Sequence, residues 1–375
     1  MLCYHNTRNM LKIMKTHFDK KKESLHPLVL LLDGGVSTHL ESMQRSHSFP
    51  DRNLWSSSLL TTESGQSDIQ KAHEDFYASG SNIVTTVTYQ LSYHAAENFG
   101  YEENDIDEML KKAVDLANQA RLSGRSSQHQ LLQPQLQNSN QSRFVMASAG
   151  CYGAVLADGS EYTGNYNLSI QQLIAFHKRR IQVFSKLEID GIAFETIPSL
   201  EEVKAVVQLI KELVNRGECK GFIWLSLACQ DSNTLNDGTS LDVVLQAVNE
   251  MDPDGHFVHG IGVNCCKVKY IHELAANIAR QEIGSSRNRA IVLYPNSGEE
   301  WDAKNESWLE GTGCTRPNDF AVEIMNCIRM IHGLCIEHNV PLLPIIVGGC
   351  CRTTTSSIKA LRAAVDEYLD QDKSL

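Results

Sequence analysis

Short apolar runs alternate along the chain with longer segments in which apolar residues recur every three or four positions. The short runs are rich in β-branched residues and have the length of buried strands. They lie at 28–35, 82–89, 143–150, 191–196, 222–228, 260–265, 290–296 and 343–349. The longer segments have helical periodicity and lie at 68–80, 105–123, 169–188, 199–217, 240–250, 269–283, 317–338 and 355–369. Eight strands that each lead into a helix predict an α/β fold, a (β/α)8 TIM-type barrel.

A doubly wound open sheet is the main alternative to the barrel. Its usual sign is a glycine-rich phosphate loop with G-x-G-x-x-G spacing after the first strand. The segment DGGVSTHL at 33–40 lacks that spacing. The runs are also nearly uniformly apolar, as strands buried on both faces should be. The barrel is therefore favoured.

The helix predicted at 199–217 has the clearest boundaries. Ser199 and Glu202 have the spacing of a capping box, in which each side chain bonds the backbone amide at the other position. Gly217 marks the predicted end of the helix.

Two stretches interrupt the alternation, and neither has the composition of a linker between domains. Residues 124–142 are rich in Gln, Ser and Asn, which predicts a polar inserted loop. Residues 297–317 form a long connection between the last two strands. Residues 1–27 are locally basic and are interpreted as an N-terminal extension. We therefore expect a single barrel domain over 28–370.

Composition and charge narrow the range of functions. Of the 375 residues, 42% are apolar and 21% are charged, as in folded proteins with a large core. The net charge of −11 disfavours a nucleic-acid partner. We recognise no secretory signal and no apolar run near the roughly 18 residues of a membrane span. With eleven scattered cysteines, these features predict a reducing, cytoplasmic location without membrane partners.

Polar residues recur where the predicted strands end. Asp33 closes the first run, Ser148 lies in the third, Glu195 is near the end of the fourth, Asn264 and Cys265 close the sixth, and Cys350 and Cys351 follow the eighth. Barrel enzymes act at this face. Each residue alone has an ordinary explanation, such as a turn at Asp33 or an ion pair at Glu195. Because burying unpaired carboxylates is costly, their recurrence on one rim indicates a ligand site.

The adjacent cysteines point to a metal. Two neighbouring thiols do not easily form a disulfide with each other, but both can reach one soft metal if Gly348 and Gly349 permit a sharp turn. The alternative is two small buried apolar residues. A third thiolate is available at Cys265 or Cys266, and strand alternation favours Cys265. Three sulfurs and one open position are typical of catalytic zinc.

Several motifs occur together in one known family. They are LDGGVSTHLE, NLWSSSLL, GSNIVTTVTYQLS, YGAVLADGSEYTGNY, FETIPSLEE, GVNC, YPNSGEEWD and VGGCCRTT. On these motifs the chain resembles the homocysteine S-methyltransferase family from about residue 30 to about residue 365. The stretch at 152–166 resembles the branch that uses S-methylmethionine or S-adenosylmethionine.

The resemblance implies a reaction and a site. The reaction is transfer of a methyl group from a sulfonium donor to homocysteine, which gives methionine. The resemblance further implies that Cys265, Cys350 and Cys351 bind Zn2+ and that Asp33 and Glu195 help to hold homocysteine. Ser148 and Asn264, on the same rim, are expected to join the substrate site.

Four positions depart from the family pattern, and none is an implied metal ligand. They are His39, Val87, Cys151 and Thr355. These departures bear on donor preference and loop geometry rather than on the reaction class. The preferred donor, the acceptance of selenium substrates and the oligomeric state have no marker in the sequence.

Other functions remain open at this point. A betaine–homocysteine methyltransferase would share the three cysteines but needs an aromatic cage for its quaternary ammonium donor. A non-enzymatic vicinal-thiol protein would bind metal or undergo reversible oxidation without methyl transfer. A barrel hydrolase with zinc-bound water would more often use His or carboxylate ligands.

Overall fold

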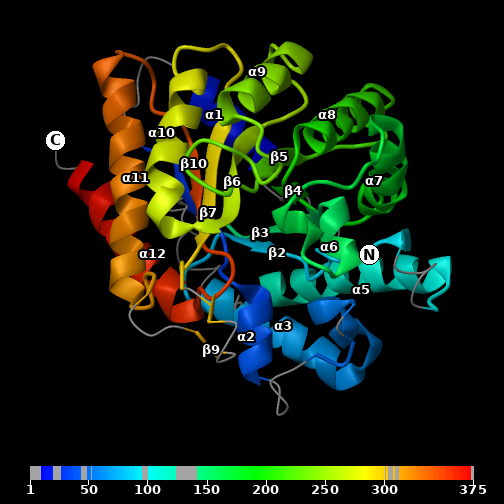
Figure 1. The fold of residues 1–375 in the computed structure, drawn as a ribbon. Helices are drawn as coiled ribbons and strands as arrows, with labels where there is room; N and C mark the ends of the chain where they lie inside the picture. The colour runs from blue at the N-terminus through cyan, green and yellow to red at the C-terminus, as the bar shows by residue number, and fades with distance from the viewer. Residues whose placement is uncertain are drawn as a thin grey trace, which may run out of the picture.

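The strands form a barrel that is surrounded by helices (Figure 1). The computed structural model describes residues 10–19, 27–43, 49–51, 53–94, 100–123, 142–299, 301–302, 307–308 and 312–372. The strands are β1 (Val29–Leu31), β2 (Ile83–Thr85), β3 (Phe144–Gly150), β4 (Gly191–Ile197), β5 (Phe222–Leu227), β6 (Gly260–Lys267), β7 (Ala290–Asn296) and β10 (Ile345–Val347). They are parallel in the order β1-β10-β7-β6-β5-β4-β3-β2, and a parallel bridge between Leu32 and Ile83 joins the two ends. The predicted (β/α)8 barrel is confirmed.

Helices cover the outside of this barrel. They are α3 (Glu63–Ala78), α5 (Glu103–Leu122), α7 (Ile170–Phe184), α8 (Leu200–Asn215), α9 (Leu241–Met251), α10 (Ile271–Glu282), α11 (Pro317–Glu337) and α12 (Thr355–Asp372). Two shorter helices, α2 (Val36–Met43) and α6 (Tyr152–Leu156), lie in the connections after β1 and β3. The connections that the structure describes contain the 3-10 segments η1 (Trp55–Thr61), η3 (Ser160–Tyr162) and η4 (Val268–Tyr270), and a hairpin of β8 (Trp301–Asp302) and β9 (Ser307–Trp308). All eight predicted helices are present, although α3 begins five residues earlier than expected because Thr62 caps it.

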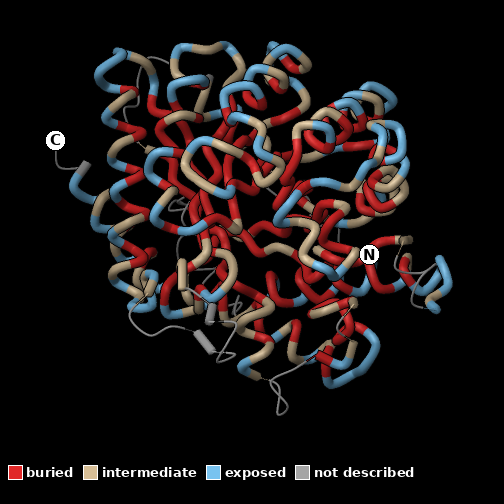
Figure 2. Tube along the Cα trace, in the orientation of Figure 1, coloured by how far each residue is buried: buried red, intermediate tan, exposed pale blue. Residues whose placement is uncertain are grey.

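The strands are buried on both faces, which explains their uniformly apolar sequence (Figure 2). One cluster fills the barrel interior and includes Leu30, Phe144, Trp224 and Ile346. A larger cluster lies between barrel and helices and includes the alternate strand positions, such as Leu31. The runs at 28–35, 82–89 and 343–349 contain only three strand residues each, because their remaining residues lie before or after the paired segment, in the connections at its two ends.

A helix in the N-terminal segment packs against the barrel. In α1 (Met10–Asp19), Met10 and Met14 are buried in the interior cluster beside Leu28, at the start of β1. His17 Nε2 lies 3.0 Å from the carbonyl oxygen of Leu342, just before β10. This end of the barrel is opposite to the rim on which the candidate residues were predicted. The sequence interpretation of 1–27 as an extension did not foresee this packing.

The N-terminus of α8 differs from the predicted capping box. Ser199 Oγ accepts a hydrogen bond from the Glu202 amide (3.3 Å), as expected. The Glu202 side chain is buried and accepts instead from the Tyr152 amide (2.7 Å) and pairs with His177 Nε2 (2.9 Å). The Glu202 side chain does not form the reciprocal hydrogen bond of the predicted capping box, so that part of the prediction is wrong. Glu202 instead links α8 to α6 and α7.

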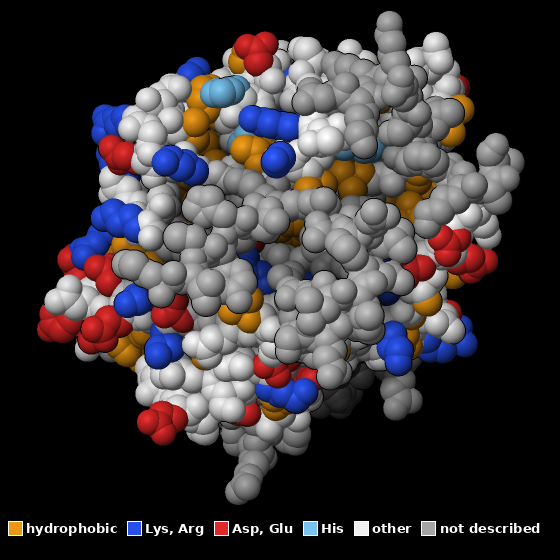
Figure 3. All heavy atoms as spheres, turned by 180° about the vertical axis from the view of Figure 1, so that it is seen from behind, with side chains coloured by type: hydrophobic (Ala, Val, Ile, Leu, Met, Phe, Trp, Pro, Cys, Tyr) orange, Lys and Arg blue, Asp and Glu red, His pale blue; other side chains and the backbone are white. Residues whose placement is uncertain are grey.

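The surface adds little to the functional argument. On the face turned away from the view of Figure 1, acidic and basic side chains are interspersed (Figure 3). Among the helices that the structure describes, none is long and apolar enough to cross a membrane. The predicted polar loop at 124–142 lies outside the described residues except for Ser142.

Candidate active site

A cavity of about 340 Å³ opens at the carboxyl ends of the strands. Seven residues that the sequence singled out lie in its wall, namely Asp33, Ser148, Glu195, Asn264, Cys265, Cys350 and Cys351. They come from β3, β4 and β6 and from the loops that follow β1 and β10. The structure therefore brings together residues that are more than 300 positions apart in the chain.

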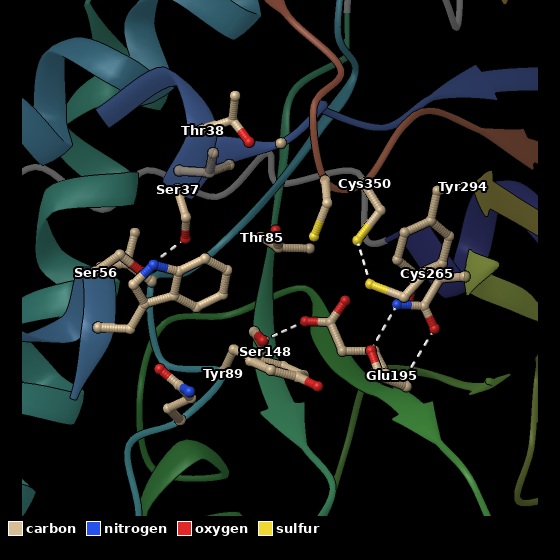
Figure 4. A pocket seen from close by; sticks show the side chains of 18 of the residues that line it. Ser37, Thr38, Ser56, Thr85, Tyr89, Ser148, Glu195, Cys265, Tyr294 and Cys350 are labelled. Atoms are coloured by element: carbon tan, nitrogen blue, oxygen red, sulfur yellow. Dashed lines mark hydrogen bonds between the residues drawn. The ribbon is translucent and has the colours of Figure 1, made fainter. Parts of the chain in front are cut away.

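Three thiols form a compact cluster at one side of this cavity. The Sγ atoms of Cys265, Cys350 and Cys351 lie within 4.8 Å of one another, and those of Cys265 and Cys350 are 2.6 Å apart (Figure 4). Hydrogen bonds from the Cys265 and Cys350 thiols lower the pKa of Cys351 well below its usual value. Cys266 is 2% exposed and packs between barrel and helices, so it faces away from the cluster as predicted.

The backbone at Cys265 departs from a regular strand. Cys265 has a φ of +50°, a left-handed conformation that a side chain other than glycine rarely adopts. The pairing of β6 with β7 shifts register between Asn264 and Lys267, at the same place. Non-glycine strain of this kind persists only where neighbouring groups hold it, and it concentrates at functional sites.

Asn296, at the end of β7, supplies part of that support. Its Nδ2 donates to the carbonyl oxygen of Cys265 (3.1 Å), and its Oδ1 accepts from the amide of Cys351 (3.1 Å). One side chain therefore joins the backbones that carry two of the three thiols. Asn296 is the last residue of the apolar run predicted at 290–296, and the sequence gave it no role.

We expect Asn296→Ala to lower the metal affinity of the thiol cluster by about 10- to 100-fold, the usual effect of removing a group that orients metal ligands. The cause is loss of both bonds that hold Cys265 and Cys351 in register. Competition with a chromophoric chelator measures the affinity. Asn277→Ala on α10, away from the cavity, serves as the control and should keep the metal affinity of the wild type. Equal affinities of the two variants would contradict the role.

Gly348 and Gly349 serve close packing rather than the sharp turn that the sequence suggested. A Cβ atom on Gly348 would lie 2.6 Å from the carbonyl oxygen of Asp33, and one on Gly349 would lie 2.2 Å from Oγ1 of Thr353. Neither glycine has a positive φ, whereas Arg352, beyond the cysteines, has a φ of +65°. The loop after β10 can therefore lie directly against the loop after β1.

Two buried carboxylates lie beside the thiols. Asp33 Oδ2 accepts hydrogen bonds from the amide (2.7 Å) and hydroxyl (3.2 Å) of Thr85, and burial raises its pKa well above the usual value. Glu195 accepts a hydrogen bond from Ser148 Oγ (Figure 4). Burial raises the pKa of Glu195 to about 7, against the opposing effect of hydrogen bonds from Ser148 and Tyr294. Both carboxylates would be stabilised by a cation in the cavity.

Asn264 has a structural partner on the adjacent strand end. Its Oδ1 accepts from the amide of Thr196 (2.8 Å) and its Nδ2 donates to the Thr196 hydroxyl (2.8 Å). Thr196 has a φ of +60°, directly after Glu195. Asn264 therefore holds the chain at the end of β4, and its direct contact with a substrate stays a prediction.

Of the four departures from the family pattern, only Val87 lies in the cavity wall. His39 pairs with Asp75 (3.1 Å), Cys151 is fully buried, and Thr355 begins α12. Sequence reasoning missed Thr85 and Tyr294, which bond the predicted carboxylates. It also missed the aromatic side chains of the wall, which come from Trp55, Tyr89 and Tyr162.

Comparison with known proteins places this geometry in a family. The model of the homocysteine S-methyltransferase family matches residues 30–365. Homocysteine S-methyltransferase 2 of Zea mays is 32% identical over 345 residues, which cover 90% of each chain. Homocysteine S-methyltransferase YbgG of Bacillus subtilis is 30% identical over 338 residues, 90% of this chain and 94% of that one.

A solved structure agrees with the sequence matches. The metallated form of the homocysteine methyltransferase MmuM from Escherichia coli superposes with a TM-score of 0.68 at 27% identity, covering 94% of this chain and 99% of that chain. The fold, the cluster of three thiols and the sequence matches therefore agree. The chain belongs to the homocysteine S-methyltransferase family.

Proposed function

We propose that this protein transfers a methyl group from a sulfonium donor, S-methylmethionine or S-adenosylmethionine, to the thiolate of homocysteine, with zinc held by Cys265, Cys350 and Cys351. The observation that carries the proposal is the cluster of three thiols beside two buried carboxylates in one cavity. Family membership gives the reaction class, and the residues of the cavity suggest how it is performed.

The donor set fits zinc. Three sulfur ligands that reach a cavity leave a position for a substrate sulfur, whereas structural zinc sites are closed by four protein ligands. The free homocysteine thiol, with a pKa near the 8.5 or so of cysteine, is mostly protonated at neutral pH, although the thiolate is the nucleophile. Zinc bound to the three cysteines would favour the thiolate form of the substrate.

The carboxylates would orient homocysteine. We assign the binding of its ammonium group to Asp33 and Glu195. Burial destabilises the ionised form of both carboxylates, and a bound cation would stabilise it. Thr85 and Ser148 hold these carboxylates in place. Because the leaving group is a neutral thioether, no general acid is required. The protein then acts mainly by aligning the attacking sulfur, the methyl carbon and the leaving sulfur.

Betaine is the second candidate donor, and one observation favours it. Trp55, Tyr89 and Tyr162 lie in the cavity wall and offer aromatic faces of the kind that bind quaternary ammonium groups. The same faces suit a sulfonium. A zinc hydrolase is disfavoured, because the cluster found among the described residues contains only thiols.

The test is methionine formation from homocysteine by purified, zinc-loaded protein, with S-methylmethionine, S-adenosylmethionine and betaine offered in parallel. We expect turnover with a sulfonium donor and none with Cys350→Ala. Turnover with betaine alone would show that the donor is a quaternary ammonium compound and not a sulfonium. If no donor reacts although X-ray absorption shows three sulfurs on zinc, homocysteine would be rejected as the acceptor.

A further inference from the structure

A third carboxylate of the cavity, Glu161, has no part in the function proposed so far. It lies in η3, the helical turn after α6, and contributes to the cavity wall. Its Oε2 is shielded from solvent and has no hydrogen-bond partner among the described residues. An ionised carboxylate with one oxygen held this way is costly. Because the Glu161 side chain also lines the substrate cavity, a cationic group bound in the cavity would offset that cost.

The backbone around Glu161 is held on two sides. Asn236, from the loop between β5 and α9, donates through Nδ2 to the carbonyl oxygen of Glu161 (2.9 Å). On the other side, a Cβ atom on Gly153 would lie 2.4 Å from the Glu161 amide nitrogen, so α6 packs directly against this turn. The carboxylate is therefore carried by a supported segment, as a preorganised binding group should be.

The charge of the cavity indicates what that ligand is. Its described wall contains Asp33, Glu161 and Glu195 but no Lys, Arg or His. Asp33 and Glu195 interact electrostatically with each other, whereas the acidic groups that act on Glu161 are Asp158 and Cys351. Glu161 is carried by η3, whereas Asp33 follows β1 and Glu195 lies in β4, so Glu161 is a second anionic point on the wall. Burial raises the pKa of Glu161, a cost that a bound cation would offset.

We propose that Glu161 binds the α-ammonium group of an amino-acid sulfonium donor, an inference that rests on the proposed function. The donor has two cationic groups, and only one keeps its charge during transfer. The sulfonium becomes a neutral thioether, so a carboxylate placed against it would stabilise the ground state more than the transition state. A carboxylate that binds the ammonium group instead stabilises the ground state and the transition state equally. Its effect is therefore on the affinity for the donor.

The experiment compares two carboxylate-to-amide changes in the same loop. Glu161→Gln removes the charge in the cavity wall, and Asp158→Asn removes an exposed charge outside that wall. We expect Glu161→Gln to raise KM for S-methylmethionine by about 10- to 100-fold, the range for a hydrogen bond to a charged group. KM for homocysteine, zinc content and thermal unfolding should stay as in the wild type. Asp158→Asn should leave homocysteine KM, zinc content and thermal unfolding unchanged. It should shift donor KM far less than Glu161→Gln does, because its charge acts on Glu161 only through space.

Two further measurements separate this inference from the proposed function. Calorimetry measures binding of S-methylmethionine without turnover, and Glu161→Asp tests whether a restored charge recovers part of the affinity. Equal donor KM in Glu161→Gln and the wild type would overturn the inference and leave methyl transfer intact, and so would a rise confined to homocysteine KM. The wild type could bind S-methylmethionine more tightly than Glu161→Gln does and yet make no methionine. That result would support the donor subsite and overturn the proposed methyl transfer. Absence of both binding and turnover in the wild type overturns both.

Discussion

Cys350→Ser is expected to lose bound zinc and to lower kcat/KM for methyl transfer by at least about 10³-fold, since a metal supplies several kcal/mol to such a reaction. The Cys350 thiol lies 2.6 Å from that of Cys265 and within 4.8 Å of that of Cys351, so it belongs to the only thiol cluster found among the described residues. A serine hydroxyl is a poor replacement for a thiolate on a soft metal. Zinc content by elemental analysis and steady-state kinetics measure the two losses.

Cys266→Ala is the matched control for this change. It removes a thiol next to Cys265 in the sequence, but one that is 2% exposed and packed against the helices. We expect the control to keep its zinc and its activity, with some loss of stability from the smaller side chain. Full zinc content in Cys350→Ser, or zinc loss in Cys266→Ala, would show that the thiol cluster is not the metal site.

The sequence was sufficient to predict the barrel and the proximity of the three cysteines. Both have a simple physical origin. Parallel strands that are buried on both faces must be apolar along their length, so they stand out in the pattern. Their carboxyl ends share one edge, so a polar residue at a strand end has a known place. β6, β7 and β10 are neighbours in the sheet, which brings Cys265 close to Cys350 and Cys351.

The partners of these residues could not be derived in the same way. Asn296 joins Cys265 to Cys351 at a place where the pairing of β6 with β7 shifts register, and no periodicity in the sequence reveals such a shift. Gly348 is required because the loop after β1, from the other end of the chain, lies against it, and Gly349 is required because Thr353 folds back onto it. Both contacts belong to the tertiary structure and have no local sequence signal.

Local sequence patterns also failed to predict the contacts of side chains that are buried against other elements. Glu202 has the spacing of a capping box, but its side chain bonds Tyr152 and His177 in the interior. The Glu202 carboxylate is fully buried and has no water to accept from, so it bonds the histidine and the backbone amide that pack against it. The basic residues Lys12 and Lys15 similarly favoured an extension over a packed helix in the sequence interpretation. They lie on one face of α1, and the opposite face places Met10 and Met14 in the barrel interior.

Glu195→Gln is expected to lower kcat/KM for homocysteine by about 10²- to 10³-fold, the cost of removing one member of a buried charge pair. Glu195 is 8% exposed and burial raises its pKa to about 7. Its neutral amide can still accept from Ser148, so the change removes charge more than shape. Ser148→Ala is the companion variant, and it should lower kcat/KM less, because it releases the carboxylate without neutralising it.

The same residue predicts a pH dependence, with a definite sign. The ionised form of Glu195 attracts the substrate ammonium group, and this form is lost as the pH falls through the pKa of about 7. kcat/KM for homocysteine reports the free enzyme, so in the wild type it should fall as the pH is lowered from 8 to 6. Glu195→Gln has no carboxyl to titrate there and should lack this limb of the profile. A limb of equal depth in wild type and variant would assign the titration to another group and leave Glu195 without a role in binding the ammonium group.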